Sequence, residues 1–337
     1  MNTAEDYGLV VGINDYKNEP YSPLFGAKRD AEDFLQWLKD PGGGNVPAAN
    51  VDPFMKLSDA AGSEPMLSHL LILLAALRGR APKGKKRIGR RLYLFMSGHG
   101  VSPKGEMDEA GLVTVDAQGP LNTFLPGKQS ADLFSLAARF DEVLLFMDCC
   151  RVTHVLLDPF KIPIPENPDP AAAAKVKRFY AFATGFGNTA REAEHGGAVR
   201  GIFSRILLDG LKAAPTDKNG RRTTTQLRTY LETEMGKIKI DGEPLVPKFP
   251  GSDEIVLAEG LMSTLSVVRL TFSQPTAAIE VLDGGNGLAP VQPGDLTQVA
   301  DGMRFTLPFG KAFVIRTADA ARTIIIKTEK EEIDATL

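Results

Sequence analysis

Hydrophobic positions alternate between two spacings along residues 5–260. Short apolar runs predict strands buried on both faces, and they lie at 7–12, 54–57, 91–100, 143–151, 179–184 and 254–257. Apolar residues that recur every three to four positions predict amphipathic helices at 26–39, 64–77, 130–140, 201–211 and 224–235. The resulting β-α-β order predicts an α/β fold, a mostly parallel sheet with helices on both faces.

The pattern changes beyond residue 261. Residues 263–337 consist of short β-branched runs separated by Gly, Pro and Asp turns, which is typical of a small all-β sandwich. This part contains no histidine and no cysteine. We therefore expect a domain at 1–261 that carries the chemistry and an accessory domain at 263–337. The accessory domain either binds a regulatory protein partner or only stabilises the chain.

Amino-acid composition and charge indicate the class of protein and the compartment in which it works. The chain is 43% hydrophobic with a net charge of −3, as expected for a soluble globular protein, and no global feature suggests nucleic acid. Its only cysteines are adjacent, so no disulfide framework is expected and a reducing cytosol fits best. The first residues lack the pattern of a secretion signal, and the apolar stretch 66–77 is too short to cross a bilayer. We expect a cytoplasmic protein without membrane contact.

Two of the predicted strands end in residues with reactive side chains. The first delivers His99 and the second Cys150, and chemistry in open α/β sheets gathers at the carboxyl ends of strands. His99 follows Ser97 by two positions, as Cys150 follows Asp148, and in extended chain such pairs point to the same side. A thiol and an imidazole side by side are the nucleophile and base of a cysteine peptidase. Cys149 is better explained as a small buried apolar residue.

Ordered motifs connect this pair to a known family. Ser-Gly-His-Gly at 97–100 and Asp-Cys-Cys-Arg at 148–151 resemble the caspase and metacaspase peptidases, whose histidine lies about 50 residues before the cysteine. Further matches in the same order lie at 10–14, 26–27, 30–31, 183–185, 192, 201–204 and 207–211. The resemblance covers about residues 5–260. It implies a caspase-like three-layer sandwich and leaves the β-rich tail outside.

The resemblance also implies a mechanism. A cysteine thiol is mostly protonated at neutral pH, and a neighbouring imidazole favours the thiolate that attacks the scissile carbonyl. His99 then returns a proton to the leaving amine. The backbone N–H groups of Gly100 and Cys150 are implied as the two donors that hold the oxyanion.

Substrate preference is predicted from the pocket beside the dyad. Caspases that cut after aspartate carry an arginine two positions before the Gly-Ala pair, where this chain has Leu24. The metacaspase pocket corresponds instead to Asp30, Ser97 and Asp148, with Ala27 beside them. Two carboxylates attract a cation and favour the planar guanidinium over an ammonium. We expect cleavage of proteins after Arg, then Lys, and essentially none after Asp.

Each pocket residue has a structural alternative. Asp30 could be an exposed residue of the first helix, with Arg29 turned inward in its place. Asp148 could merely cap the next turn.

Calcium is the cofactor to consider, because many metacaspases require it through acidic loops. Here Asp116, with Asp108 and Glu109, supplies few of the six to eight oxygens that the ion prefers. The paired aspartates expected near Asp116 are missing, since Ala117 follows. We expect no cofactor and no calcium requirement.

A proline-rich linker inside the first domain is expected at about 158–178, since the run 158–170 cannot form helix or sheet interior. Family members are cut between two subunits in this region. Four basic residues of the linker are candidates for self-cleavage: Lys161, Lys175, Lys177 and Arg178.

The resemblance suggests a regulated prokaryotic protease of signalling, antiviral defence or cell death. Two alternatives stay open. One is a catalytically silent, caspase-like adaptor that acts through residues 263–337, and the other is a different cysteine hydrolase on a doubly wound sheet. A hydrolase of that kind would lack the match at 201–211.

Overall fold

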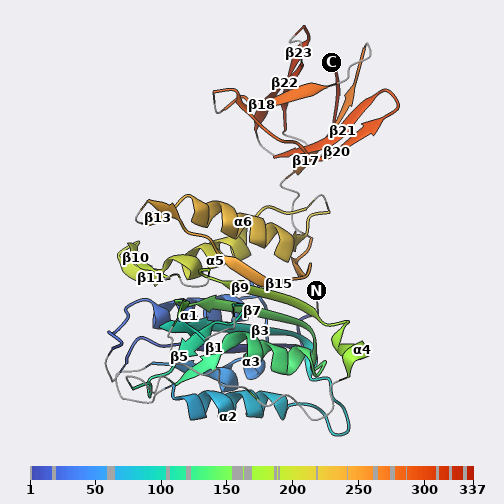
Figure 1. Cartoon of the computed structure of the whole chain (residues 1–337). Helices are drawn as coiled ribbons and strands as arrows, with labels where there is room; N and C mark the ends of the chain where they lie inside the picture. Colours follow the sequence, from blue (N-terminus) through green and yellow to red (C-terminus); the bar gives the residue numbers. More distant parts are fainter. Residues whose placement is uncertain are drawn as a thin grey trace. The chain divides into compact units, whose positions relative to one another are not determined.

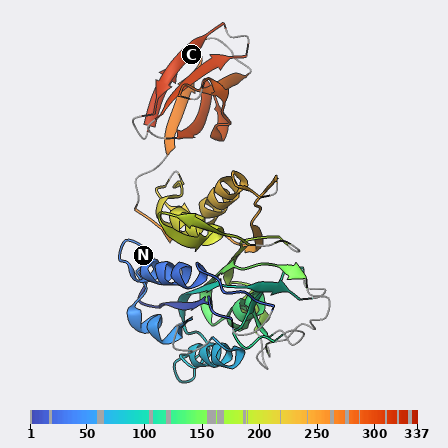
Figure 2. The same ribbon diagram turned by 90° about the vertical axis from the view of Figure 1, so that its left-hand side faces the viewer.

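The computed structural model is shown in two views in Figures 1 and 2. It describes residues 2–16, 20–58, 65–103, 107–118, 123–153, 162, 169–185, 188, 190–217, 219–240, 242–260, 265–273, 278–285, 287–308, 311–318, 321–328 and 332–337. The chain forms two compact units, Met1–Ala213 with Leu227–Ile255, and Ala214–Gln226 with Val256–Leu337. The predicted domains at 1–261 and 263–337 stay a prediction, and the units are described separately.

The first unit is built on a six-stranded sheet in the order β15-β9-β7-β3-β1-β2. Its strands are β1 (Asp6–Gly12), β2 (Met55–Leu57), β3 (Gly89–Ser97), β7 (Phe140–Asp148), β9 (Lys177–Phe182) and β15 (Lys248–Ser252). All neighbours pair in parallel except β15, which is antiparallel to β9. Its helices are α1 (Ala27–Lys39), α2 (Leu67–Arg78), α3 (Gly127–Ser135), α4 (Pro170–Ala173), α5 (Ile202–Ala213) and, from Leu227 on, α6 (Thr224–Gly236), with 3₁₀ turns at Ala48–Asn50 and Asp52–Phe54.

The central strands are apolar throughout because both of their faces are covered. Alternate residues such as Leu94 and Leu145 join one core with α2 and α3. The residues between them face α1, where the ring of Phe34 stacks on Phe95 with 4.5 Å between centroids and packs against Phe146. Figure 1 shows α2 and α3 on the opposite side of the sheet from α5. The predicted α/β architecture is confirmed.

The edge strand β15 differs from the expectation. The sequence predicts the last strand at 254–257, but the main sheet ends with Lys248–Ser252. This strand contains Pro250 and Gly251, and its pairing with β9 is interrupted between Lys248 and Gly251. Proline and glycine are tolerated at an edge strand with an irregular register, so the segment lacks the apolar pattern of a strand.

Small strands clamp the loops that follow β3 and β7. These are β4 (Gly100–Ser102), β5 (Gly111–Val113), β6 (Phe124–Pro126) and β8 (Val152–Thr153), in the order β6-β5-β4-β8. Val101 of β4 pairs in parallel with Val152 of β8. The two chain segments are therefore paired on both sides of His99 and Cys150. Before these residues β3 pairs with β7, and after them β4 pairs with β8.

Two hairpins complete the first unit. One consists of β10 (Glu192–His195) and β11 (Ala198–Gly201), and the other of β13 (Lys239–Ile240) and β14 (Glu243–Pro244). Gly196 and Gly197 form the turn of the first hairpin, with φ of 59° and 77°. Two consecutive residues with positive φ favour glycine and match the turn that tight hairpins prefer.

The chain enters β9 earlier than the predicted end of the linker. Asp169 caps α4, its Oδ1 accepting from the N–H of Ala172 at 3.0 Å. Lys177 and Arg178 are already part of β9, and the Arg178 guanidinium donates to Ser135 Oγ at 3.0 Å and to the carbonyl of Ala173 at 2.8 Å. Lys175 is exposed, whereas Lys161 lies outside the described residues.

The second unit contains two four-stranded sheets and a short strand pair. One sheet has the order β20-β21-β17-β24, the other β19-β18-β22-β23. The bounds are β17 (Leu265–Thr271), β18 (Ile279–Asp283), β19 (Ala289–Pro290), β20 (Gly294–Val299), β21 (Gly302–Pro308), β22 (Ala312–Thr317), β23 (Thr323–Lys327) and β24 (Glu332–Thr336), with β12 (Arg222–Thr223) paired to β16 (Val256–Ala258). Alternate residues of both sheets, such as Leu270, Phe305 and Ile315, form one buried core. Over the described part of the whole chain, no helix has the length and apolarity needed to cross a membrane.

Candidate active site

The carboxyl ends of β1, β3 and β7 lie in one row. Ser97, the last residue of β3, pairs with Gly12 on one side and with Asp148 on the other. A Cβ at Gly12 would lie 2.6 Å from the Cβ of Ala31 in α1. The first turns of α1 therefore pack directly on the end of β1, next to Ser97.

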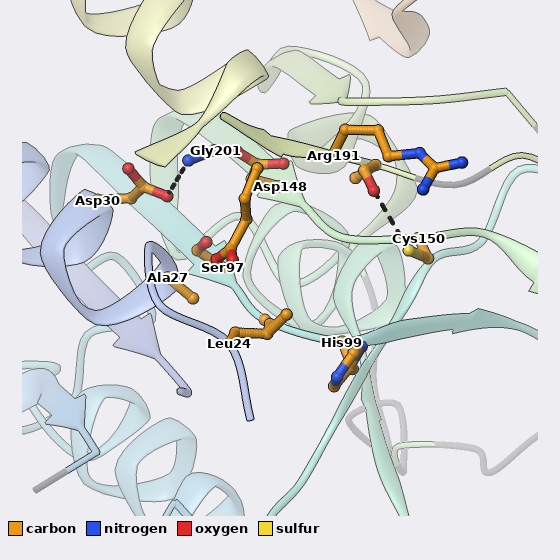
Figure 3. A pocket seen from close by; sticks show the side chains of 12 residues that line it. Leu24, Ala27, Asp30, Ser97, His99, Asp148, Cys150, Arg191 and Gly201 are labelled. Atoms are coloured by element: carbon orange, nitrogen blue, oxygen red, sulfur yellow. Dashed lines mark hydrogen bonds between the residues drawn. The ribbon is translucent and has the colours of Figure 1, made fainter. Parts of the chain in front are cut away.

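A pocket of about 340 Å³ opens at this row (Figure 3). Its walls come from α1 and the chain before it, the ends of β3 and β7, and the β10–β11 hairpin with the residues before it. It is lined by Leu24, Ala27, Asp30, Ser97, Gly98, His99, Asp148, Cys150, Ala190, Arg191, Glu192 and Gly201. The pocket thus brings together both predicted dyad side chains and the four predicted substrate-binding residues.

The His99 side chain has a defined tautomer. Its Nε2 lies 2.8 Å from the carbonyl oxygen of Ser22, which only accepts, so Nε2 carries the proton. This leaves Nδ1 free to take up another proton. Burial lowers the pKa of His99, while the Ser22 carbonyl and the Glu192 carboxylate act to raise it.

The Cys150 thiol faces the same pocket. It donates a weak hydrogen bond to the carbonyl of Ala190, with 3.7 Å between Sγ and oxygen, as the dashed line in Figure 3 marks. Burial raises the pKa of Cys150, and the charge of Arg191 acts in the opposite direction. The resting thiol is therefore neutral and becomes a nucleophile when a base takes its proton.

Cys149 has a different environment. It is fully buried in the core beneath the sheet, and burial raises its pKa well above the usual value. A Cβ on Gly100 would lie 2.6 Å from the Cβ of Cys149, so these two positions are in close contact. Cys149 behaves as a core residue that supports the loop, whereas Cys150 is accessible from the pocket.

Two carboxylates form the closed end of the pocket. Asp30 accepts from the N–H of Gly201 at 2.9 Å, and Asp148 accepts from the N–H and the hydroxyl of Ser204 at 3.0 and 2.7 Å. Both are almost fully buried, at 1% and 5% exposure. Burial raises the pKa of each, and the proximity of Asp148 raises that of Asp30 further. Asp30 Oδ1 is buried without a hydrogen-bond partner among the described residues.

The structural alternatives for Asp30 and Asp148 do not fare alike. Arg29 is exposed and Asp30 turns inward, so Asp30 is no exposed helix residue. Asp148 does accept from the backbone at Ser204, but its carboxylate also lines the pocket. A Cβ on Gly201 would lie 2.0 Å from Asp148 Oδ2 and 2.8 Å from Asp30 Oδ2, so glycine is needed where the hairpin passes the two acids.

Sequence reasoning missed Glu192 as a pocket residue. Its carboxylate accepts from the N–H groups of Gly26 and Phe25 at 2.7 and 3.1 Å, which fixes the start of α1. Glu192 pairs with Gly201 across the β10–β11 hairpin. The available signal was the Gly-Gly turn between Glu192 and the motif at Gly201, which predicts a hairpin that returns both residues to one place.

Buried Arg151 supports the loop beneath Cys150. It is 2% exposed and donates to the carbonyls of Glu109 and Thr184 at 3.2 and 3.3 Å, with its guanidinium 5.1 Å from the ring centre of Phe182. The arginine of the Asp-Cys-Cys-Arg motif thus ties three segments together.

Two of the three carboxylates considered for calcium, Glu109 and Asp116, accept hydrogen bonds from backbone N–H groups. Glu109 accepts from the backbone N–H groups of Ala110, Lys128 and Gln129 at 2.7–3.0 Å, the last two at the start of α3. Asp116 accepts from the N–H of Leu67 at the start of α2 at 3.2 Å. Within the described ranges, no group of three or more His, Cys, Asp or Glu side chains is arranged to hold a metal ion.

The chain is similar to one curated protein described as a probable protease, from a Desulfuromonadales bacterium. The two are 27% identical over 226 residues, which make up 64% of this chain and 27% of that protein. The chain therefore spans well under a third of that relative's length. No family model matches the sequence.

Solved structures with similar folds include caspase-1 from Spodoptera frugiperda, at 14% identity and a TM-score of 0.45, covering 74% of this chain and 89% of that one. A protein from Geobacter sulfurreducens matches at 15% identity and a TM-score of 0.41, over 73% and 92% of the two chains. In the structure itself, the sheet order sets the histidine and cysteine strands side by side, as expected from the chemistry of open α/β sheets. The α/β architecture is the one that the sequence predicts.

The buried acids predict a stability that depends on pH. An unfolded aspartate ionises near pH 4, and the folded pKa values of Asp30 and Asp148 are higher. The folded state holds more protons in between, so the free energy of unfolding falls as pH rises through this window. Asp30→Asn removes one charge and should raise the midpoint of thermal unfolding by about 2–4 °C at pH 8, which corresponds to about 1 kcal/mol.

At pH 5 the midpoint of thermal unfolding of Asp30→Asn should exceed that of the wild type by much less. Glu32→Gln, an exposed change on the same helix, is the matched control and should behave alike at both pH values. An equal gain for Asp30→Asn at pH 5 and pH 8 would show that the charge of Asp30 does not strain the fold.

Proposed function

We propose that the protein is a cysteine endopeptidase that uses His99 and Cys150 and cleaves proteins after arginine and, less well, lysine. The observation that carries the proposal is the position of Asp30. Its carboxylate lines the same pocket as the Cys150 thiol, and its buried Oδ1 has no hydrogen-bond partner in the described part of the chain. Leaving such an acceptor unpaired is costly, and a donor from the substrate would complete it.

The dyad supports a two-step reaction. Nδ1 of His99 takes the thiol proton, and the thiolate of Cys150 attacks the scissile carbonyl to give a tetrahedral oxyanion. The backbone N–H groups of Gly100 and Cys150 are the proposed donors to this oxyanion. As the C–N bond breaks, the imidazolium gives its proton to the leaving amine and a thioester remains. Water, deprotonated by His99, then hydrolyses the thioester and restores the thiol.

Electrostatics supports the preference for a basic residue. A guanidinium in the pocket meets Asp30, Asp148 and Glu192 and offers five N–H donors in a planar fork. An ammonium brings the charge but fewer directed bonds. An aspartate side chain would meet the like charges of these carboxylates, and Leu24 stands where caspases specific for aspartate carry an arginine.

The first test concerns the dyad. Cys150→Ala and His99→Gln should each lower kcat/KM on a fluorogenic arginine peptide by about 10³-fold or more, because neither partner acts alone. Cys149→Ala and His69→Gln are the matched controls and should retain activity within a few-fold. Wild-type protein that hydrolyses no peptide at all would favour the alternative of a silent adaptor.

The second test concerns the substrate residue that precedes the cleaved bond. It uses peptides that differ only at that position. Wild type should prefer Arg to Lys and discriminate against Asp by about 10³-fold, the effect of several kcal/mol of like-charge repulsion. Asp30→Asn and Asp148→Asn should lose about 10²-fold in kcat/KM on the arginine peptide, mostly through KM. Glu32→Gln should match the wild type. Unchanged arginine cleavage in both pocket variants would refute the pocket assignment.

The third test concerns self-cleavage in the linker. Lys177 and Arg178 belong to β9 and are hydrogen-bonded there, so cleavage is proposed at exposed Lys175 or at Lys161. Purified wild type should yield two fragments on a denaturing gel, and the Cys150→Ala protein one intact band. The double variant Lys161→Gln/Lys175→Gln should also remain intact. A single intact band for active wild type would exclude the idea.

A further inference from the structure

The loop that leaves β1 surrounds the His99 imidazole with two tyrosine rings. The ring centroid of Tyr16 lies 4.7 Å from that of His99, and Tyr21 lies 5.3 Å away on the same loop. The two tyrosine rings also contact each other, with 5.8 Å between centroids. The Ser22 carbonyl that fixes the imidazole tautomer follows Tyr21 directly. One short loop therefore supplies all of these contacts.

The Tyr16 hydroxyl holds the histidine backbone. It accepts the N–H of His99 at 2.7 Å, and Tyr16 is only 9% exposed. Gly98 has a φ of 158°, and a Cβ there would lie 2.7 Å from the Tyr16 oxygen. The glycine before the histidine therefore leaves room for the hydroxyl that anchors it. This gives the Gly-His pair of the motif a specific physical purpose.

Tyr21 contributes in a different way. Its hydroxyl oxygen is buried and has no hydrogen-bond partner among the residues the structure describes. A hydroxyl without a partner gives no reason for tyrosine at this position, so the contribution lies in the ring. Both rings are within the roughly 6 Å at which an aromatic system attracts a cation. An imidazolium is such a cation, and it forms when His99 takes the proton of Cys150.

We propose that Tyr16 and Tyr21 are positioning residues of the dyad: the Tyr16 hydroxyl fixes the His99 backbone, and the two rings stabilise the imidazolium. The inference rests on the proposed function, because it gives His99 the role of the base. Other groups that act on His99 or on the rings around it are the Glu192 carboxylate, the Cys150 and Cys149 thiols and the Ser22 carbonyl. Burial lowers the pKa of His99, and the Ser22 carbonyl and the Glu192 carboxylate offset part of that effect. In this proposal the two rings add to the stabilisation of the imidazolium.

The decisive measurement is the titration of His99 by NMR in the Cys150→Ala background. The chain has four histidines, and the signal that disappears in His99→Gln identifies the one needed. Tyr21→Leu removes a ring and should lower the pKa of His99. Tyr21→Phe keeps the ring and should leave the pKa unchanged. Because the measurement needs no peptidase activity, it stands even if every peptide assay fails.

Kinetics test the second role. Tyr16→Phe keeps the ring but leaves a backbone N–H unpaired, and it should lower kcat by about tenfold with little change in KM, since substrate contacts remain. Tyr7→Phe and Tyr7→Leu are the matched controls, because Tyr7 packs against Phe54 and Phe140 instead of His99. Thermal unfolding separates these effects from a general loss of stability.

The outcomes are distinct. An unchanged or raised His99 pKa in Tyr21→Leu would overturn the role of the rings. A Tyr16→Phe protein with wild-type kcat, or with losses equal to those of Tyr7→Phe, would overturn the role of the hydroxyl. If both pKa and kcat respond as stated while the Tyr7 variants do not, the two tyrosines belong to the dyad.

Discussion

Everything at the site depends on paired backbone on both sides of the two reactive residues. In-register pairing of β3 with β7 aligns Ser97 with Asp148, and β4 pairs with β8 two residues beyond the dyad. His99 and Cys150 are thus short inserts between two fixed points. Neither loop can shift along its neighbour without breaking a ladder of hydrogen bonds on one side. The position of these two segments is therefore a property of the sheet, while contacts such as those from Tyr16 and Ser22 hold the His99 backbone and ring.

The pocket beside His99 and Cys150 lowers the local stability of the fold. Two aspartates are buried together, with few donors to satisfy them, and their pKa values rise as a result. Such strain persists because β3, β7, α1 and α5 hold the surrounding backbone in place. Functional sites commonly give up stability in this way, since groups arranged for a ligand are poorly matched when it is absent.

The sheet and the meeting of His99 and Cys150 in one pocket could be predicted because both depend on local patterns. The apolar runs that end at Ser97 and Asp148 are long, and each is followed by its reactive residue within two positions. The edge strand β15 was not predicted, because Pro250 and Gly251 interrupt the apolar pattern by which a strand is recognised. The contacts of Glu192 with Gly26 and of Tyr16 with His99 were not predictable, since they cross distances of 166 and 83 residues along the chain. The sequence also indicated no partners for Glu109 and Asp116, whose carboxylates accept from backbone N–H groups at the starts of α3 and α2.

The arrangement of the two acids in this pocket requires a residue without a side chain at Gly201. The carboxylates of Asp30 and Asp148 crowd the space where its side chain would be, and the Gly201 N–H provides one of the few donors they have. A single added methyl group would thus displace both acids at once, although glycine itself carries no chemistry. Mutations usually abolish a specificity by deleting a charged group. Here one added methyl group would disturb both carboxylates, which makes the hairpin backbone as sensitive to mutation as the acids themselves.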